Sequence, residues 1–351
     1  MKIFKSGNWK HKALLIPVAI ILGFLPGSPE ELFSFFQYRD RYCSQNASSP
    51  YCNFSVVRTI EGHPTASAIV ISADGQTLVS GGQDKTIKVW ELQTGKLKKT
   101  LRSDSGAIND LAIAPDGKTV VSGSGDRLVR IWDLTSDQPP QKLRGHSGNV
   151  TDVHISSDGK TIMSRDRGDS PEIKIWDMAT GKQKARLPYI HFDDISPDGK
   201  NVLITLPSSK LVAWDVATNQ QQVLQQFFDP TLDSGLISLD GQTLINIKRA
   251  RKDYLHLQVS DFKTGTVKAK KRFSRQVFSP YSIAISRNFM IGSTSKGLTV
   301  WNLQTAELEA VIDQKQEQIS HLVVSSDGKL LAGITGNSDD SNSIIKVLQR
   351  P

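Results

Sequence analysis

The stretch that decides the fold is Ile87-Lys-Val-Trp-Glu-Leu-Gln-Thr-Gly-Lys96. Its alternating apolar and polar residues predict a β-strand, and the Thr-Gly pair after the strand predicts a tight turn. Six further segments repeat the pattern: VRIWDLTSDQ from Val129, IKIWDMATGK from Ile173, LVAWDVATNQ from Leu211, LQVSDFKTGT from Leu257, LTVWNLQTAE from Leu298 and IKVLQRP from Ile345. The chain is therefore built largely from one repeated unit.

One marker residue in each segment fixes the length of the repeat. The markers are Trp90, Trp132, Trp176, Trp214, Ser260, Trp301 and Leu348, spaced 42, 44, 38, 46, 41 and 47 residues apart. Upstream of them lie the turn pairs Asp74-Gly75, Asp116-Gly117, Asp158-Gly159, Asp198-Gly199, Asp240-Gly241 and Asp327-Gly328, with Arg287-Asn288 in the sixth place. Asp-Gly and Asn supply the positive φ that tight hairpins need. Each unit is predicted to be about four short strands joined by such turns.

The repeat, together with the Gly62-His63 and Gly145-His146 openings, resembles the WD-repeat family over residues 55–351. The resemblance implies an all-β fold, a seven-bladed β-propeller of four-stranded antiparallel blades. The last repeat ends after its third strand, and residues 55–60 form a spare strand before the first Gly-His pair. We therefore expect the N-terminal strand to complete blade 7, which leaves no incomplete blade. The turn and hairpin sequences are similar to those of bacterial members.

The resemblance also implies a buried polar network in the first three repeats. In the first repeat it links an Asp to a His, the His to a Ser, and the Ser to the marker Trp. The residues assigned to this structural network are His63, Ser80, Asp84, Trp90, Ser122, Asp126, Trp132, His146, Ser164 and Trp176. The second repeat has Asp104 where the His would be, and the third has Asp169 displaced by one residue. Later repeats are expected to rely mainly on apolar packing.

Three motifs resemble catalytic, metal-binding or nucleotide-binding sites, but the pattern of none of them supports that function. The Ser, His and Asp of the first repeat suggest a nucleophilic triad, but a buried network satisfies polar groups instead of presenting a nucleophile. His191, Asp193 and Asp194 suggest a metal site, but adjacent residues of an extended chain point to opposite sides. The segment around Gly123 lacks the third glycine of a dinucleotide fingerprint. We predict no enzyme, no catalytic residue, no cofactor and no metal.

The charge of the chain is concentrated in one repeat. The 43 Lys and Arg exceed the 35 Asp and Glu by 8. Residues 248–275 alone hold Lys248, Arg249, Arg251, Lys252, Lys263, Lys268, Lys270, Lys271, Arg272 and Arg275 against Asp253 and Asp261, which is also +8. In the geometry of the family, the connection at 248–252 and the strand end at 271–275 emerge on the same face as the Gly-His loops. Clustered charge of one sign focuses the potential.

This cluster is the favoured partner surface. The proposed partner-binding residues are Lys248, Arg249, Arg251, Lys252, Lys270, Lys271, Arg272 and Arg275. An acidic protein surface suits them, while a solvated surface without a partner stays open as an alternative. Phospholipid headgroups are disfavoured, because a tether at residue 55 would draw the opposite face toward a membrane. Nucleic acid is disfavoured because no aromatic stacking platform accompanies the charge.

Residues 1–25 are predicted to be a signal peptide or a signal anchor. Four lysines without an acid precede thirteen uncharged residues, 13–25. As a helix these thirteen residues rise about 20 Å, which is short for a hydrocarbon core of about 30 Å. The lack of an A-x-A site nevertheless favours an uncleaved transmembrane helix. In both cases the basic end stays in the cytoplasm and the propeller lies outside it, in the periplasm or its equivalent.

Residues 26–54 are predicted to be a linker with a short helix from Ser28. Cys43 and Cys52 bracket a short polar loop, and they are the only two cysteines of the chain. A disulfide between them suits an exported protein, with two free thiols as the alternative. Two cysteines and the absence of a CxxC pair exclude a disulfide-built scaffold and a structural zinc site.

Taken together, the sequence predicts a membrane-tethered or exported monomeric propeller that acts as a non-enzymatic scaffold for a protein partner. Two alternatives stay open. One is an enzyme or a small-ligand-binding propeller that uses the central channel. The other is an intracellular WD-repeat scaffold in which residues 1–25 form a buried helix.

Overall fold

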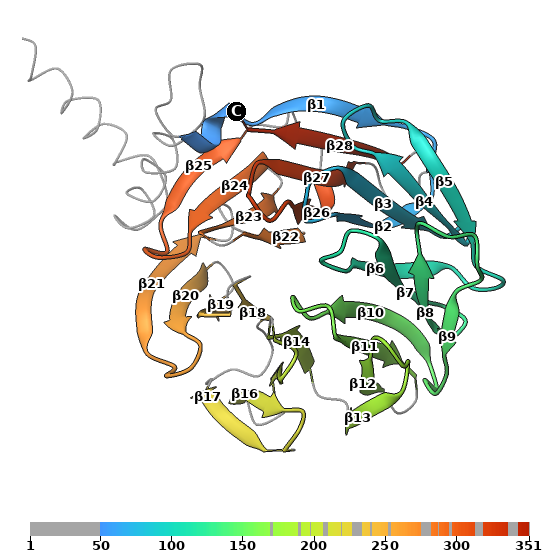
Figure 1. Cartoon of the computed structure of the whole chain (residues 1–351). Coiled ribbons are helices and arrows are strands. Elements are labelled where there is room, and N and C mark those ends of the chain that lie inside the picture. The colour runs from blue at the N-terminus through green and yellow to red at the C-terminus, as the bar shows by residue number, and fades with distance from the viewer. Residues whose placement is uncertain are drawn as a thin grey trace, which may run out of the picture. The chain divides into compact units, whose positions relative to one another are not determined.

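The computed structural model describes residues 50–168, 171–188, 191–196, 198–205, 210–218, 220–226, 234–238, 241–251, 254–274, 282–286, 288–294, 297–312, 319–335 and 343–350. Seven antiparallel sheets of four strands each form a ring (Figure 1). The predicted seven-bladed β-propeller is therefore confirmed. A 3-10 helix, η1 (Pro50–Asn53), precedes the first strand.

Blades 1 to 4 follow one another along the chain. Blade 1 consists of β2 (Ala66–Ile71), β3 (Thr77–Gly82), β4 (Thr86–Glu91) and β5 (Leu97–Arg102). Blade 2 consists of β6 (Ile108–Ile113), β7 (Thr119–Ser124), β8 (Val129–Asp133) and β9 (Gln141–Leu143). Blade 3 consists of β10 (Asn149–Ile155), β11 (Thr161–Arg167), β12 (Glu172–Asp177) and β13 (Gln183–Pro188). Blade 4 consists of β14 (His191–Ile195), β15 (Asn201–Thr205), β16 (Lys210–Asp215) and β17 (Gln221–Gln226).

Blades 5 to 7 complete the ring. Blade 5 consists of β18 (Ser234–Ile237), β19 (Thr243–Arg251), β20 (Tyr254–Asp261) and β21 (Val267–Ser274). Blade 6 consists of β22 (Ser282–Ile285), β23 (Phe289–Thr294), β24 (Gly297–Asn302) and β25 (Leu308–Ile312). Blade 7 consists of β26 (Ile319–Val324), β27 (Leu330–Thr335), β28 (Ile344–Gln349) and β1 (Ser55–Ile60). The first-named strand of each blade faces the centre of the ring (Figure 1).

The N-terminal strand closes the ring, as the sequence predicts. β1 is the outermost strand of blade 7 and pairs antiparallel with β28, with Ile60 opposite Ile345. The segment before β1 also contacts the ring of blades, because the aromatic ring centroids of Tyr51 in η1 and Phe289 in blade 6 lie 5.1 Å apart. The guanidinium of Arg350 lies 5.1 Å from the Tyr51 ring centroid. Residues from both ends of the propeller thus meet at the junction of blades 6 and 7.

The acidic-glycine turns have the predicted conformation. Gly75, Gly117, Gly159, Gly199, Gly241 and Gly328 have φ between 66° and 72°. At Gly75 the space is also limited, since an added Cβ would lie 2.9 Å from Cδ1 of Leu330 in blade 7. A side chain at this position would therefore be strained by both backbone and packing.

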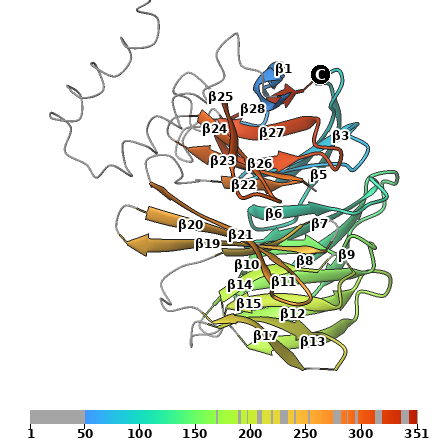
Figure 2. The same cartoon turned by 90° about the vertical axis from the view of Figure 1, so that its left-hand side faces the viewer.

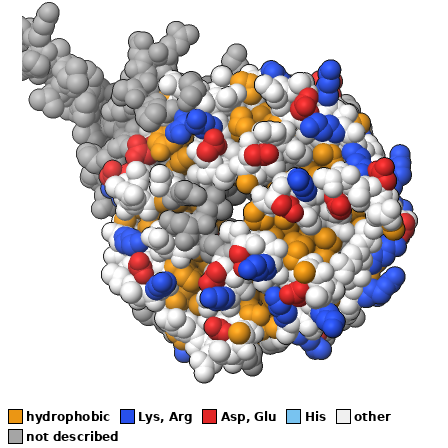
Figure 3. All heavy atoms as spheres, viewed as in Figure 1, with side chains coloured by type: hydrophobic (Ala, Val, Ile, Leu, Met, Phe, Trp, Pro, Cys, Tyr) orange, Lys and Arg blue, Asp and Glu red, His pale blue; other side chains and the backbone are white. Residues whose placement is uncertain are grey.

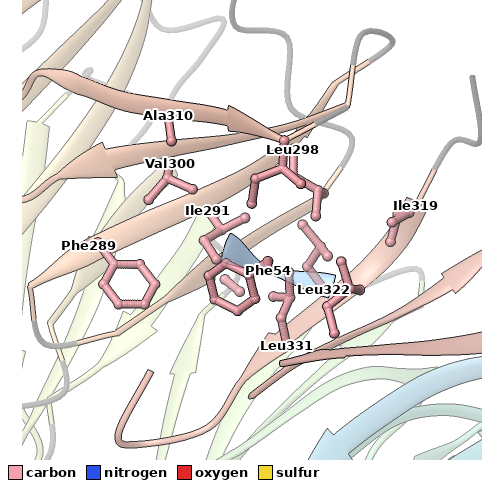
Figure 4. Close-up of a cluster of buried hydrophobic side chains, with 12 residues drawn as sticks. Phe54, Phe289, Ile291, Leu298, Val300, Ala310, Ile319, Leu322 and Leu331 are labelled. Carbon is pink, nitrogen blue, oxygen red and sulfur yellow. The ribbon is translucent and has the colours of Figure 1, made fainter. Parts of the chain in front are cut away.

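The core lies between neighbouring blades, where the faces of two sheets meet. One cluster combines blades 1 and 2 around Val89, Ile108 and Trp132. Another combines blades 6 and 7 and includes Phe54, which is 6% exposed although it lies just before β1 (Figure 4). Each blade therefore buries its faces against two neighbours, so the closing strand stabilises the whole ring.

The predicted N-terminal features lie outside the described residues. These are the leader at 1–25, the linker helix from Ser28, and Cys43 of the predicted disulfide. Cys52 lies in η1 and packs, partly buried, against the core of blades 6 and 7. Within the described ranges, no helix is long and apolar enough to span a membrane.

Candidate functional site

The polar network of blade 1 is present in the structure. His63 Nδ1 lies 2.6 Å from Ser80 Oγ, and the indole N–H of Trp90 donates to the same oxygen at 2.8 Å. On its other side, His63 Nε2 lies 3.3 Å from Asp84 Oδ1. Asp84 also accepts hydrogen bonds from the backbone N–H and the hydroxyl of Thr86, at 3.0 and 2.8 Å. The network fixes the turn between β3 and β4 against the connection that precedes β2.

This geometry does not suit a nucleophilic triad. Ser80 is fully buried and His63 is 2% exposed, so a substrate cannot reach the hydroxyl. Burial lowers the pKa of His63, although the neighbouring carboxylate of Asp84 opposes the shift. The imidazole is therefore neutral and acts as a hydrogen-bonding bridge within the blade.

Blade 3 repeats the network with a different acid. His146 Nε2 lies 2.6 Å from Ser164 Oγ, and Trp176 donates to that oxygen at 2.8 Å. His146 Nδ1 lies 3.1 Å from Asp166 Oδ2, and both side chains are fully buried. The repeat predicted Asp169 for this role, but that residue lies outside the described residues and Asp166 fills the position. Asp166 lies within the extended β11, so spacing from the marker Trp could not identify it.

Blade 2 uses an arginine where the histidine is missing. Arg130 is 1% exposed, and its Nη1 donates to Asp126 Oδ1 at 3.0 Å. Trp132 still donates to Ser122 Oγ, at 2.9 Å. Asp104, which stands at the histidine position of the sequence pattern, instead forms an exposed ion pair with Lys142. Burial of Arg130 could not be predicted from the repeat pattern, because blades 1 and 3 have Lys88 and Lys174 at the corresponding positions.

The later blades depart from this network. Ser260 of blade 5 accepts a hydrogen bond from Gln258 Nε2 at 3.2 Å, where other blades have the marker Trp. Trp301 of blade 6 is fully buried. The ring of Phe273 from blade 5 packs edge-on against it, with the two ring centroids 4.2 Å apart. Phe273 thus packs the end of β21 against the neighbouring blade.

Side chains near the ring centre tie neighbouring inner strands together. Ser67 of β2 donates to the carbonyl of Ile108 in β6 at 2.8 Å. Asp110 of β6 accepts a hydrogen bond from the N–H of Val153 in β10 at 2.9 Å. Asp194 of β14 accepts one from the N–H of Ile237 in β18 at 2.8 Å. These bonds couple blade 1 to 2, 2 to 3 and 4 to 5. His191, Asp193 and Asp194 all lie on β14, and no group of three or more metal-binding side chains occurs among the described residues.

The carboxyl of Asp110 has a strongly shifted pKa. Burial, with the nearby charge of Asp152, raises the pKa of Asp110 to about 7, against the effect of hydrogen bonds from the N–H groups of Val153 and Leu111. Asp152 is itself engaged by Arg165, whose Nε donates to Asp152 Oδ2 at 2.8 Å. Asp110 therefore has a structural role between blades 2 and 3.

A groove of about 670 Å³ lies between blades 7 and 1. Its lining includes Val57, Leu92 and Val347, with Arg58 and Lys98 among the polar residues. The groove is partly bridged, because Arg58 Nε donates to the carbonyl of Gln93 at 2.9 Å. The bridge links the closing strand of blade 7 to the hairpin that joins β4 and β5 of blade 1.

The basic segments of blade 5 come together in the sheet. Lys248 of β19 and Arg272 of β21 are both paired with His256 of the strand between them. Paired residues of antiparallel strands share a face of the sheet, and the two positions are about 10 Å apart. Lys270, Lys271 and Arg272 have exposed side chains.

One detail of this surface differs from the sequence prediction. Residues 248–251 belong to the strand β19 itself, whereas the repeat placed them in the connection after it. Pairing with Tyr254 and Leu255 extends the hairpin through the basic segment. Lys252 and Arg275 lie outside the described residues.

Comparisons with known proteins agree with this architecture. Residues 54–91, 95–133 and 137–177 match the family model described as WD domain, G-beta repeat. The solved β-propeller domain of Cps50 (Swd1) from Myceliophteria thermophila has a TM-score of 0.67 to this chain at 15% identity. That match covers 84% of this chain and 99% of the domain, and it shows the fold. The structure is thus a seven-bladed β-propeller, and three of its repeats match the WD-domain model.

The curated relative is similar over a short segment. The chain is 38% identical over 69 residues to Protein valois of Drosophila melanogaster. The match spans 19% of this chain and 18% of that protein.

Proposed function

We propose that this protein is an exported or membrane-tethered interaction platform, and that the basic surface of blade 5 docks an acidic protein partner. We define this basic surface as Lys248, Arg249, Arg251, Lys252, Lys270, Lys271, Arg272 and Arg275. The proposal includes no catalytic step and no cofactor. Its location outside the cytoplasm rests on the leader sequence at residues 1–25.

The observation that carries the proposal is the pairing register of blade 5. Two basic segments more than twenty residues apart in the sequence are brought to the same end of one sheet, with Lys248 and Arg272 opposite the same residue. This is the end where, in blade 1, the Asp84 turn meets His63. A surface at one end of a rigid sheet keeps its charges in fixed relative positions, which favours recognition of a partner of defined shape.

Two lysines of β21 pair with acids of the described residues. Lys268 pairs with Asp261 at 3.4 Å, at the opposite end of β20 and β21. Lys271 pairs with Glu307 of blade 6 at 3.4 Å, and this exposed pair contributes little to stability. The outer strand of blade 4, β17, has the uncharged sequence QQVLQQ. An acidic partner would therefore meet mainly positive charge.

The test is co-purification with crosslinking from native membranes, comparing the wild type with Lys270→Glu/Lys271→Glu/Arg272→Glu. We expect at least one partner to be lost from the variant. The matched control is Lys96→Glu/Lys182→Glu/Lys263→Glu, because these exposed lysines lie in or beside the hairpins at the other end of blades 1, 3 and 5. Equal melting temperatures of the two variants would exclude unfolding as the cause.

The results separate the possibilities. Loss of the same partner from the control variant would show that net charge alone matters and would contradict a docking surface on blade 5. A partner set that is unchanged in the blade 5 variant would also contradict the proposal. Proteolysis of intact spheroplasts or cells with and without membrane disruption tests the location, since an exported propeller is cleaved in both cases.

A further inference from the structure

We propose that the partner docks on blade 5 by adding an extended acidic segment to the outer edge of β21 as a fifth strand. The inference rests on the platform function proposed above and names the form of the partner. Strand addition joins backbone groups for affinity and uses alternate side chains for specificity. Three features of blade 5 support it: the length of its edge, its projection from the ring, and the spacing of its charges.

The first feature is the length of the exposed edge. β21 is the outermost strand of blade 5, since the strand order is β18-β19-β20-β21. It has eight residues, whereas the outermost strands of the other blades have three to six. Eight residues of antiparallel strand span about 27 Å. Among the outer strands as described, β21 can therefore pair with the longest segment.

The second feature is that the end of blade 5 projects from the ring. β19 has nine residues and β20 has eight, and their pairing continues to Arg251 opposite Tyr254. β21 follows them to the end, with Ser274 opposite the same tyrosine. Figure 2 shows β19 and β20 reaching beyond the strands of the neighbouring blades.

The third feature is the alternation of basic residues along the edge. Lys270 and Arg272 are two residues apart and share one face of β21, whereas a β-bulge at Lys268 interrupts the alternation before them. The opposite face is turned toward blade 6, where Phe273 contacts Trp301 and Lys271 pairs with Glu307. A fifth strand with acids at alternate positions would place two of them beside Lys270 and Arg272. Oppositely charged cross-strand neighbours stabilise such a pair of strands.

Lysines on an edge strand also explain why the partner must be acidic. Charged side chains, lysine above all, protect an exposed edge from pairing with neutral or apolar strands. On β5 of blade 1, Lys98 lies at the position of Lys268 and likewise pairs with an acid, Glu91, and Lys99 pairs with Asp137. On β21 no acid of the described residues pairs with Lys270. The same charge that excludes neutral strands would select an acidic one. Figure 3 shows that elsewhere on this face Lys and Arg side chains are interspersed with Asp and Glu.

The test uses a defined probe, the fluorescein-labelled peptide Thr-Glu-Thr-Glu-Thr-Glu-Thr-Glu, and the full-length protein in detergent. Binding is measured by fluorescence anisotropy at low and high salt. A second peptide has the same sequence and charge but is N-methylated at alternate residues, which removes backbone donors along one edge. Both registers of methylation are tested, so that the edge facing β21 is blocked in one of them. We expect one methylated peptide to bind at least tenfold more weakly than the parent peptide.

Protein variants complete the test. Lys270→Glu/Arg272→Glu is expected to weaken the parent peptide at least tenfold. The control Lys96→Glu/Arg102→Glu, at exposed positions of blade 1, is expected to change binding less than twofold. The comparison of peptides leaves the protein unaltered, so it remains decisive if a variant fails to fold.

The outcomes separate this inference from the proposed function. Equal binding of all three peptides would overturn strand addition, while loss of the native partner on charge reversal would still support acidic docking. No peptide binding, with binding to phosphatidylserine vesicles instead, would overturn strand addition and point to lipid. Retention of the native partner after charge reversal would contradict the proposed function itself.

Discussion

Arg130 in blade 2 forms a buried ion pair with Asp126, and this pair replaces the histidine–aspartate contact of blades 1 and 3. The Arg130 side chain is 1% exposed and that of Asp126 is 10% exposed. Asp126 also accepts a hydrogen bond from the hydroxyl of Ser105 at 2.9 Å. The same place in neighbouring blades is thus held by a neutral bridge in one case and by a charge pair in another.

The first prediction follows from this pair. Arg130→Ala should lower the free energy of unfolding by about 3–5 kcal/mol, because it leaves the charge of Asp126 without its partner in a buried site. The double variant Arg130→Met/Asp126→Asn should be much less harmful, since it removes both charges. Urea unfolding of the two proteins measures the difference. Equal losses would show that packing of the Arg130 side chain, and not its charge, matters.

The second prediction concerns the serine at the centre of each network. Ser80 accepts a hydrogen bond from the indole of Trp90 and also contacts the ring of His63. Ser122 accepts a hydrogen bond from the indole of Trp132, but blade 2 has no histidine to contact it. Ser80→Ala should destabilise the protein by about 1–3 kcal/mol, because it leaves two buried groups without a partner. Ser122→Ala should cost about half as much. Thermal unfolding of both variants tests this, and a larger loss for Ser122→Ala would contradict it.

How far sequence could predict this protein depends on what repeats. The markers and Asp-Gly turns recur, so the number of blades, the strand order and the closure of blade 7 follow from them. Arg130 and Asp166 could not be assigned, because burial depends on packing between blades and each occurs once. The extended β19 was missed for a related reason. Lysine and arginine are weak strand markers, so the run at 248–251 predicted charge but no pairing.

The third prediction is a pH dependence of stability between blades 2 and 3. Because the pKa of Asp110 is raised to about 7 from its ordinary value near 4, folding favours the protonated form. Its contribution to stability is complete below about pH 4 and is lost as the pH rises through 7. Asp110→Asn removes this contribution. The variant should therefore lose less stability than the wild type between pH 5 and pH 8.

The comparison must be made on the difference between the two proteins, because other groups titrate in the opposite sense. The pKa of His63 is lowered by burial, so its contribution to stability is present above pH 6.5 and falls as the solution becomes acidic. Urea unfolding midpoints at pH 5, 6, 7 and 8 supply the data. If the unfolding midpoints of the wild type and the variant differ by the same amount at every pH, Asp110 does not titrate in this range.

The last prediction tests the closure of the ring. Phe54 is 6% exposed and packs among Phe289, Leu322 and Leu331 between blades 6 and 7 (Figure 4). Phe54→Ala should cost about 3–5 kcal/mol, the range for removing a buried aromatic side chain. Val56 lies two residues later on β1 but is 46% exposed, so Val56→Ala should change stability by about 0.5 kcal/mol or less. Thermal unfolding measures both. If Phe54 closes the ring, Phe54→Ala should raise amide hydrogen exchange in all blades, because every blade buries its faces against two neighbours. If Phe54 acts only locally, the substitution would leave hydrogen exchange in blade 2 unchanged.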